Sequence, residues 1–463
     1  MRLSPLIMAL AALAALIVVG FVGAKVLQPN RPLLTDVSFS LSRITPNADG
    51  VDDVTTINYT VNRNASVTIT FTSKADGKRF VFRNAQERAA GSYGVQFSGV
   101  VDGYTLPDEK TIGDVQTRLM PNGDYTWSVD ANAVDSGEKL SSTGTLTIAD
   151  GDSALPAITD FSISPQTFTP NQDGIDDRVS INVYLAKAAT LTVYLQNQDQ
   201  QRFYIAEHIE GRKPGDPGAH YFDYDGGVDN NVPPPPDGKY TVVAEAQDDV
   251  GQRVSRTGEV TISQGGLPNA ELAAQAGSGG TVFWSTLPYR DAYMTDIQTP
   301  GEQVPQPQGV TSTLATLSMP KDDLLIFSVT VSNYGSTPIR TFGPWPGTVY
   351  QYEQTEAAMG SDFKSGGWRV GVMCEGSETT FPWRWALGSQ DQLTKVDRDG
   401  QTFWYLLPNK TAVVWGAVRM TKLIKPRNPQ ECWAGLIHED VTIPNTQGHV
   451  GPIKVILTQT VSQ

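Results

Sequence analysis

The sequence predicts an all-β protein built from antiparallel sandwiches, preceded by one N-terminal hydrophobic helix. Two observations predict the sandwiches: a long segment of the chain occurs twice, and short stretches alternate apolar with β-branched polar residues between Asp-Gly and Asn-Gly turns. A chain of 463 residues also has room for two to four domains, at roughly 100–200 residues each.

The N-terminus carries an uncharged apolar run of 20 residues, from Pro5 to Ala24. At about 1.5 Å per residue, a helix of this length spans a hydrocarbon core of about 30 Å. Val22-Gly23-Ala24 would also serve as a small-residue cleavage site. Residues 1–34 are therefore predicted to be either a signal anchor or a cleaved signal peptide, followed by a stalk. Both alternatives place the rest of the chain outside the cytoplasmic membrane.

An internal repeat organises the next part of the chain. Residues 36–71 align without a gap to residues 160–195, an offset of 124. Both copies contain the motif TPN-x-DG-[VI]-DD, at Thr45–Asp53 and Thr169–Asp177. Two tandem copies of one domain are predicted.

The two repeats are assigned to residues 35–149 and 157–263. Within the first, residues 56–61 and 66–71 alternate apolar and polar side chains around a four-residue turn, as half-buried strands do. Short strands at hairpin spacing favour an Ig-like antiparallel sandwich. Neither repeat contains cysteine, so the disulfide-pinned form of that sandwich is excluded.

These motifs resemble the Ig-like domain named after the flagellar hook-capping protein FlgD. The resemblance covers roughly residues 36–149 and 158–263, and the second copy also has an aromatic, Asp-Gly-rich segment at 221–242. The first copy departs from the pattern at 97–125, where it is longer. The resemblance implies a spacer or docking module at a bacterial surface rather than a catalyst.

The repeated Asn-x-Asp-Gly loops are candidate calcium sites. Oxygen-bearing side chains at alternate positions around a glycine bend suit Ca²⁺, which takes oxygen ligands. The alternative is an Asx-turn in which the same side chains bond local N–H groups. The predicted ligands are Asn47, Asp49, Asp53, Asn171, Asp173 and Asp177.

The C-terminal part differs in composition. Residues 264–310 are predicted to be a linker, and residues 311–463 a Trp-rich β-sandwich. Both cysteines of the chain, Cys374 and Cys432, lie in this region. Because an exported protein meets oxidising conditions, they are predicted to form a disulfide; two buried thiols are the alternative.

Two clusters in this region are candidate sites. Trp383, Arg384 and Trp385 are candidate ligand-binding residues: alternation along a strand would place the two indoles on one face and Arg384 on the other, a geometry that could stack on a sugar ring or on a partner's proline. The alternative is core packing, with Arg384 over an aromatic face. His438-Glu439-Asp440 could be a catalytic or metal cluster, but it has no partner at ligand spacing, which favours a structural role.

Part of the last region also has a family resemblance. Residues 322–345 contain a strand and turn similar to Ig-like domains with a V-x-V-x-N-x-G-[ST]-x-P pattern, as in BsuPI-type proteinase inhibitors and CARDB-type adhesion modules. The whole region looks like an extracytoplasmic β-domain of bacterial surface proteins. This resemblance implies a fold and no activity.

The composition of the chain argues against several classes of function. The chain has 35 Lys and Arg against 49 Asp and Glu, a net charge of −14, which argues against nucleic acid as a partner. Four histidines and two cysteines leave little for an active site, so no enzyme and no certain cofactor are predicted. We expect a membrane-tethered structural or adhesion protein of the bacterial cell surface, with Ig-like spacers and a binding head. Its partner would be a surface protein or glycan; the alternatives are a carbohydrate-binding module and a self-associating subunit of a filament or layer.

Overall fold

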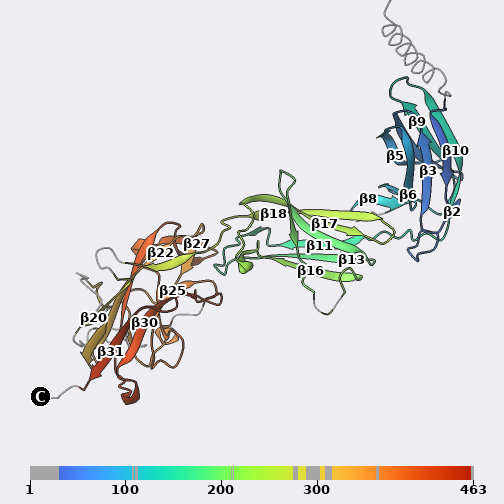
Figure 1. Cartoon of the computed structure of the whole chain (residues 1–463). Helices are drawn as coiled ribbons and strands as arrows, with labels where there is room; N and C mark the ends of the chain where they lie inside the picture. The colour runs from blue at the N-terminus through green and yellow to red at the C-terminus, as the bar shows by residue number, and fades with distance from the viewer. Residues whose placement is uncertain are drawn as a thin grey trace, which may run out of the picture.

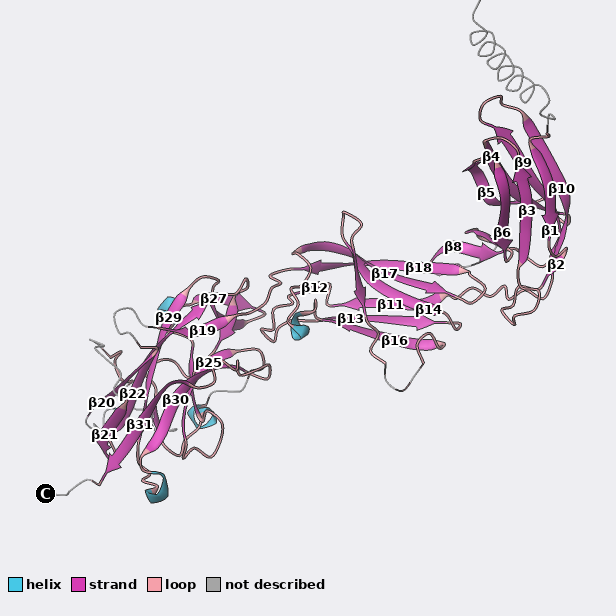
Figure 2. Cartoon of the chain, viewed as in Figure 1, coloured by secondary structure: helices cyan, strands magenta, loops and turns pink. Residues whose placement is uncertain are grey.

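The computed structural model describes residues 31–459 except 107–108, 110–112, 210, 212, 275–279, 288–292, 294–302, 308–314 and 361–363. Strands dominate it, arranged as three bodies in series (Figures 1 and 2). We call these bodies the first unit, the second unit and the head. Short 3-10 helices lie in the connections: η1 (Val228–Asn230), η3 (Glu356–Met359), η4 (Gln390–Gln392) and η5 (Lys425–Arg427).

The predicted N-terminal hydrophobic helix falls on residues 1–30, which lie outside the described residues. Among the described residues, no helix has the length and apolar character needed to span a membrane.

The first unit is a sandwich of two sheets with the strand orders β1-β3-β6 and β2-β10-β9-β4-β5. Alternation along β3 turns Ile57, Tyr59 and Val61 inward, as the sequence predicts. Phe71 and Phe97 stack with ring centroids 4.3 Å apart and so join the two sheets. The strands are β1 (Leu34–Phe39), β2 (Arg43–Ile44), β3 (Thr55–Val61), β4 (Ala65–Ser73), β5 (Arg79–Arg88), β6 (Gly91–Phe97), β9 (Gly123–Ala133) and β10 (Lys139–Ile148).

The second unit repeats this architecture. Its sheets have the orders β11-β13-β16 and β15-β14-β17-β18, with β12 parallel to β18 as β2 is to β10. A separate apolar core lies between them, from Ile158 to Ile262. The strands are β11 (Ile158–Ser164), β12 (Thr167–Phe168), β13 (Val179–Leu185), β14 (Thr190–Gln196), β15 (Arg202–Ile205), β16 (Gly218–Tyr224), β17 (Gly238–Gln247) and β18 (Arg253–Ile262).

A hairpin from the first repeat crosses to the second unit. The longer middle of the first repeat forms β7 (Val100–Asp102) and β8 (Asp114–Leu119), and β8 pairs antiparallel with β18 at Arg253–Ser255. The sequence assigned this segment to the first domain. The structure instead adds it to the neighbouring sheet, because an uncovered strand edge offers unpaired backbone groups.

Buried Gln252 fastens this first junction. Its side-chain oxygen accepts a hydrogen bond from the Leu119 backbone N–H at 3.2 Å, and its amide donates to the carbonyls of Asp152 and Ala154 at 3.0 and 2.9 Å. The first junction is therefore a continuous hydrogen-bonded sheet rather than a loose tether.

The head is a larger sandwich of two sheets. Their orders are β19-β22-β29-β24, with β20 beside β22, and β21-β31-β30-β25-β23-β28-β27, with β26 beside β25. The strands are β19 (Ala270–Ala273), β20 (Val282–Leu287), β21 (Thr316–Pro320), β22 (Leu324–Asn333), β23 (Ile339–Thr341), β24 (Val349–Gln351), β25 (Trp368–Cys374), β26 (Trp383–Ala386), β27 (Thr394–Arg398), β28 (Gln401–Leu406), β29 (Thr411–Arg419), β30 (Gln430–His438) and β31 (Val450–Thr458).

Part of the predicted linker belongs to the head. Strands β19 and β20 lie within 264–310, and both pair with β22. Leu272, Val282 and Trp284 of these strands are buried in the core of the head. The composition around them is rich in Gly and Ala and therefore predicted a linker. The two short strands are stabilised by pairing with β22.

Candidate functional site

The two Asn-x-Asp-Gly loops have nearly the same internal hydrogen bonds. In the first, the Asp53 carboxylate accepts hydrogen bonds from the backbone N–H groups of Asn47 and Ala48, each at 2.9 Å, and of Gly50 at 2.7 Å. Asn47 Oδ1 accepts from the Asp49 N–H at 3.0 Å. The side chains named in the calcium prediction thus bond the loop's own backbone, as in the Asx-turn alternative.

The second loop repeats this pattern. Asp177 accepts from the backbone N–H groups of Asp173 at 3.1 Å and Gly174 at 2.6 Å, and Asn171 Oδ1 accepts from the Asp173 N–H at 3.0 Å. Within the described part of the chain, no three His, Cys, Asp or Glu side chains are grouped to hold a metal ion. Calcium binding stays a prediction; calorimetric titration of the chain with millimolar Ca²⁺ tests it, and the absence of heat would contradict it.

The second loop docks on the head. Tyr405 of β28 donates its hydroxyl to Asp173 Oδ2 at 3.0 Å, and Arg398 forms an ion pair with Asp176. His438 Nε2 lies 2.8 Å from the Gln172 carbonyl oxygen. These contacts make the second junction, which the sequence did not predict.

Burial at this junction raises the pKa values of two carboxyl groups in the loop. Desolvation raises the pKa of Asp173, and desolvation together with the neighbouring Asp173 carboxylate raises the pKa of Asp177 to about 6. In the first loop, burial raises the pKa of Asp53, but hydrogen bonds from three backbone N–H groups lower it by more, so its pKa lies below the ordinary value. One motif therefore has opposite electrostatics in two settings.

The predicted disulfide is confirmed. Cys374 and Cys432 lie directly opposite each other on β25 and β30, with Cα atoms 4.0 Å apart, and their sulfurs are bonded. The sequence separation is 58 residues.

The Trp383-Arg384-Trp385 segment has an alternating orientation, but its indoles face the core. Both Trp383 and Trp385 are 0% exposed. The Trp385 ring contacts the Phe327 ring edge-on, with centroids 4.6 Å apart. Neither indole presents a face to a ligand, because the inward face of β26 is sealed by the facing sheet.

The His438-Glu439 cluster is structural. Glu439 is buried and accepts hydrogen bonds from Arg369 Nε at 2.6 Å and from Arg384 at 2.8 Å. Arg384, a predicted ligand contact, therefore forms an ion pair within the head. His438 stacks on Trp368 with centroids 4.3 Å apart, and burial lowers its pKa to about 4.

A different set of aromatic residues borders an open cleft in the head. Two adjoining hollows, of about 340 and 220 Å³, share Phe342, Gly343, Trp345 and Lys364 in their linings. We call them together the aromatic cleft. The other lining residues are Arg340, Thr341, Pro344, Met359, Gly360, Thr402, Phe403 and Trp404.

Local sequence explains why these rings are accessible. Residues 343–347, Gly-Pro-Trp-Pro-Gly, follow β23, and a proline cannot donate to a sheet, so the chain leaves the sheet here. The Thr348 hydroxyl donates to the Trp345 carbonyl at 2.8 Å and closes the turn. Thr341 pairs with Trp404 on β28, which places the second indole beside the turn.

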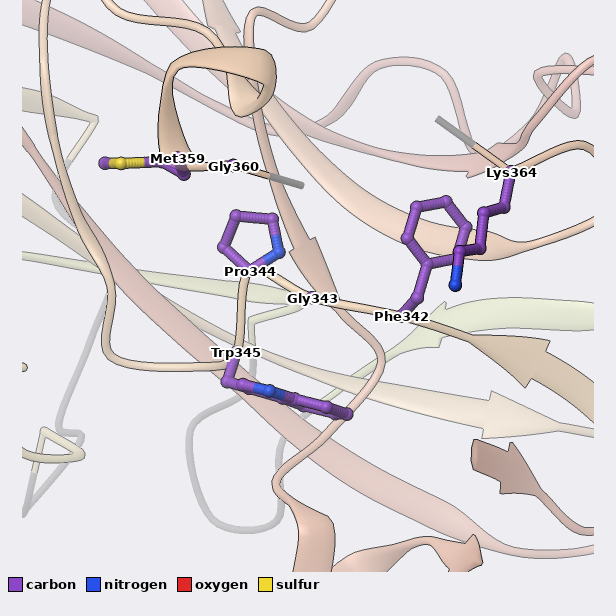
Figure 3. A pocket seen from close by; sticks show the side chains of 7 residues that line it. All are labelled: Phe342, Gly343, Pro344, Trp345, Met359, Gly360 and Lys364. Carbon is purple, nitrogen blue, oxygen red and sulfur yellow. The ribbon is translucent and has the colours of Figure 1, made fainter. Parts of the chain in front are cut away.

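The rings form a partly exposed surface. Trp345 and Trp404 meet edge to face with centroids 5.7 Å apart, and Phe342 and Phe403 are also only partly buried. Figure 3 shows Phe342 and Lys364 on one side of the Pro344-Trp345 turn and Met359 on the other. The sequence signal for this site is Trp345, which lies between two prolines. No binding role was predicted for it.

The cleft is basic. Lys364 is exposed, whereas Arg340 is 5% exposed. Arg340 donates to the Ser365 carbonyl, and its Nε has no hydrogen-bond partner among the described residues. Aromatic faces beside cationic side chains can stack on an apolar ring face and pair with an anion.

Comparison with known proteins does not identify the chain. No family model matches it, and no curated protein matches it. Among solved structures, the tetra-tandem repeat in the extending region of a large adhesion protein is 12% identical, with 91% of this chain and 73% of that chain covered and a TM-score of 0.16.

Two further structures have similar scores. A 1.5-MDa bacterial ice-binding adhesin is 11% identical over 92% of this chain and 99% of that one, with a TM-score of 0.17. The fibronectin(III)-like modules of Clostridium thermocellum CbhA are 10% identical over 49% and 93%, also with a TM-score of 0.17. These scores are too low to carry an argument about function, and the FlgD-type likeness stays a prediction.

Proposed function

We propose that this chain is a modular binding protein of the bacterial cell surface, in which two Ig-like spacers carry a head that binds carbohydrate in the aromatic cleft. One observation carries the proposal: Trp345, Trp404 and Phe342 are partly exposed in a single concave surface. Sugar rings have apolar C–H faces that stack on indole and phenyl rings, and ligand sites are usually concave and rich in aromatic side chains.

The arrangement in series supports the spacer role. The β8 strand joins the first unit to the second, and the loop at 171–177 joins the second unit to the head. Both junctions involve hydrogen bonds beyond the connecting chain, which favours a stiff rod. Display outside the cell rests on the predicted export segment at residues 5–24.

Binding rather than catalysis is proposed. His438 is directed at a backbone carbonyl of the second unit, and Glu439 is paired with two arginines. Neither is arranged for proton transfer to a ligand in the cleft.

The proposal is tested by glycan-array binding of the purified full-length chain. We expect binding that Trp345→Ala and Trp404→Ala each reduce at least about tenfold, the effect expected from losing roughly 1.4 kcal/mol of ring contact. Trp433→Ala is the matched control, because Trp433 is also partly exposed on the head but contacts the His449 ring outside the cleft. Equal losses in all three variants, or no glycan bound, would contradict the proposal.

Self-association is a second candidate. In the described structure, β9 pairs with one edge of β10, and no strand pairs with the other edge at Lys139–Ser141, the stretch that corresponds to Arg253–Ser255 where β18 receives β8. A strand from a second copy could add to this edge. Light scattering of the wild type and of Ser141→Pro tests it; a monomer at all concentrations would contradict it.

A further inference from the structure

We propose that docking of the second unit holds the aromatic cleft in its binding shape, so that ligand binding in the cleft and closure of the second junction strengthen each other. The effect on ligands rests on the proposed carbohydrate binding, whereas the structural coupling does not. Cleft and junction have a wall in common, residues 364–367, which we call the shared segment. Its first residue lines the cleft, its last packs on a cleft ring, and the two between them contact the loop at 171–177.

The shared segment lies directly against the backbone of the second unit. A Cβ built on Gly174 would lie 2.1 Å from the Ser365 carbonyl oxygen, and one built on Gly366 would lie 2.3 Å from the Gly174 backbone nitrogen. Gly366 also has a φ of +78°, a conformation that L side chains rarely adopt. The path of the shared segment therefore depends on the loop that packs on it.

The same segment supports the Phe342 ring of the cleft. A Cβ built on Gly367 would lie 2.1 Å from Phe342 Cε1, so the Gly367 backbone packs directly on this ring. The Arg369 guanidinium lies over the ring, 4.5 Å from its centroid, and its Nε donates to Glu439 at 2.6 Å. The Glu439 carbonyl accepts from the Gly366 N–H at 2.8 Å, and the Glu439 N–H donates to the Gly367 carbonyl at 2.9 Å. Moving the shared segment would therefore move the support of Phe342.

Two strands of the cleft reach the same loop. On β28, Trp404 lines the cleft, and the next residue, Tyr405, donates its hydroxyl to Asp173 at 3.0 Å. On β23, Arg340 lines the cleft, donates to the Ser365 carbonyl and attracts the Asp173 carboxylate. Opening the junction would remove these contacts together, because closely packed interfaces switch between discrete arrangements rather than deform continuously.

The coupling acts in both directions. If the docked arrangement binds a ligand more tightly, the bound ligand must stabilise the docked arrangement by the same factor. Occupation of the cleft would therefore stiffen the joint between the second unit and the head. A spacer protein with this property is most rigid when its head holds a ligand.

Hydrogen exchange of the full-length chain tests the coupling without a ligand. Gly174→Ala overpacks the junction, and Tyr405→Phe removes one hydrogen bond without adding volume. In both variants we expect peptides covering residues 341–348 and 401–404 to exchange about fivefold faster, the factor expected from the loss of one hydrogen bond. Peptides of β22 should exchange at the wild-type rate.

Gly50→Ala and Tyr125→Phe are the matched controls. Gly50 has the equivalent place in the first loop, with a φ of +87°, and the Tyr125 hydroxyl donates to the Pro121 carbonyl at 2.6 Å. Both residues lie in the first unit, so their substitution should leave exchange in the cleft unchanged. Wild-type exchange of the cleft peptides in Gly174→Ala and Tyr405→Phe would overturn the coupling.

The glycan array tests the consequence for binding. We expect Gly174→Ala and Tyr405→Phe to weaken binding about fivefold or more, the lower end of ordinary coupling factors. A bound glycan should slow exchange of the Gly366 amide in the wild type and not in Trp345→Ala. Unchanged glycan binding in both junction variants would overturn the effect on ligands. Faster exchange in the cleft with no glycan bound would overturn carbohydrate binding and leave the structural coupling standing.

Discussion

The loops at 45–53 and 169–177 share a motif and a hydrogen-bond pattern but occupy different surroundings. Asp49 and Gly50 of the first loop are exposed to solvent, whereas Asn171 and Asp173 of the second are buried against the head. The comparison shows that a short motif can determine a loop's shape without determining its electrostatics, because hydrogen bonds within the loop are local and desolvation comes from whatever packs on it.

The largest expected difference is between Gly174→Ala and Gly50→Ala. Both glycines have positive φ, +80° and +87°, so either alanine costs about 1–2 kcal/mol of backbone strain. An added Cβ at Gly174 would lie 2.1 Å from the Ser365 carbonyl oxygen, whereas one at Gly50 would have nothing within 4 Å. Overpacking should add about 1–3 kcal/mol at the second loop alone.

Urea unfolding measures this difference, and hydrogen exchange locates it. We expect faster exchange of the Gly366 amide, which bonds the Glu439 carbonyl at the junction, in Gly174→Ala only. Equal destabilisation by the two substitutions would show that the second loop does not dock.

The next difference is between Asp177→Ala and Asp53→Ala. Each removes the acceptor of backbone N–H groups, but water can replace it only at the exposed first loop. We expect a loss of about 2–3 kcal/mol for Asp177→Ala and about 1 kcal/mol for Asp53→Ala in the free energy of unfolding. A larger loss for Asp53→Ala by the same measurement would contradict the burial argument.

A rise in pH should change the contributions of the two loops to the free energy of unfolding in opposite directions. The folded pKa of Asp177 is raised to about 6 from 3.8, so its contribution to stability is present below 3.8 and is lost as pH rises through about 6. The folded pKa of Asp53 is lowered, so its contribution is present above 3.8 and is lost as pH falls through the folded value.

His438 opposes Asp177 at the same junction. Its folded pKa of about 4 lies below its ordinary 6.5, so its neutral form stabilises the junction above 6.5, and that contribution is lost as pH falls toward 4. Unfolding of Asp177→Asn and Asp53→Asn in chelator-treated buffer measures each loop's contribution against the wild type, over a pH range that runs from below 3.8, the ordinary pKa of Asp53, to above about 6, the folded pKa of Asp177. Identical pH profiles of the two variants would contradict the assignment.

The smallest expected effect is that of Arg398→Ala. Arg398 and Asp176 form an ion pair, but their side chains are 45% and 36% exposed. Solvent and salt screen such a pair, so we expect a loss of about 0.5 kcal/mol that vanishes in high salt. A loss above about 2 kcal/mol would show that the ion pair, rather than the buried Asp173–Tyr405 contact, holds the junction.

Much of the fold could be predicted from the sequence. The all-β architecture, the repeat and the Cys374–Cys432 disulfide agree with the structure. The inward orientation of Trp383 and Trp385 was one of two open alternatives, since alternation fixes which residues share a face but not which face is buried.

The junctions and the cleft could not be predicted. β8 alternates like any strand, and its partner β18 lies in another repeat. The cleft combines a turn after β23 with β28 and Lys364, which no spacing in the sequence relates. Only the proline-flanked Trp345 hinted at an exposed ring.

The sequence by itself determined what depends on neighbouring residues: strand alternation, turns, and the bonds of each Asp loop to its own backbone. Tertiary structure alone decided which loop is buried, which strand edge is covered, and which aromatic rings remain accessible. The reason is physical: Asp173 and Tyr405 are 232 residues apart, and the desolvation that raises the pKa of Asp173 arises only when the head packs on the loop.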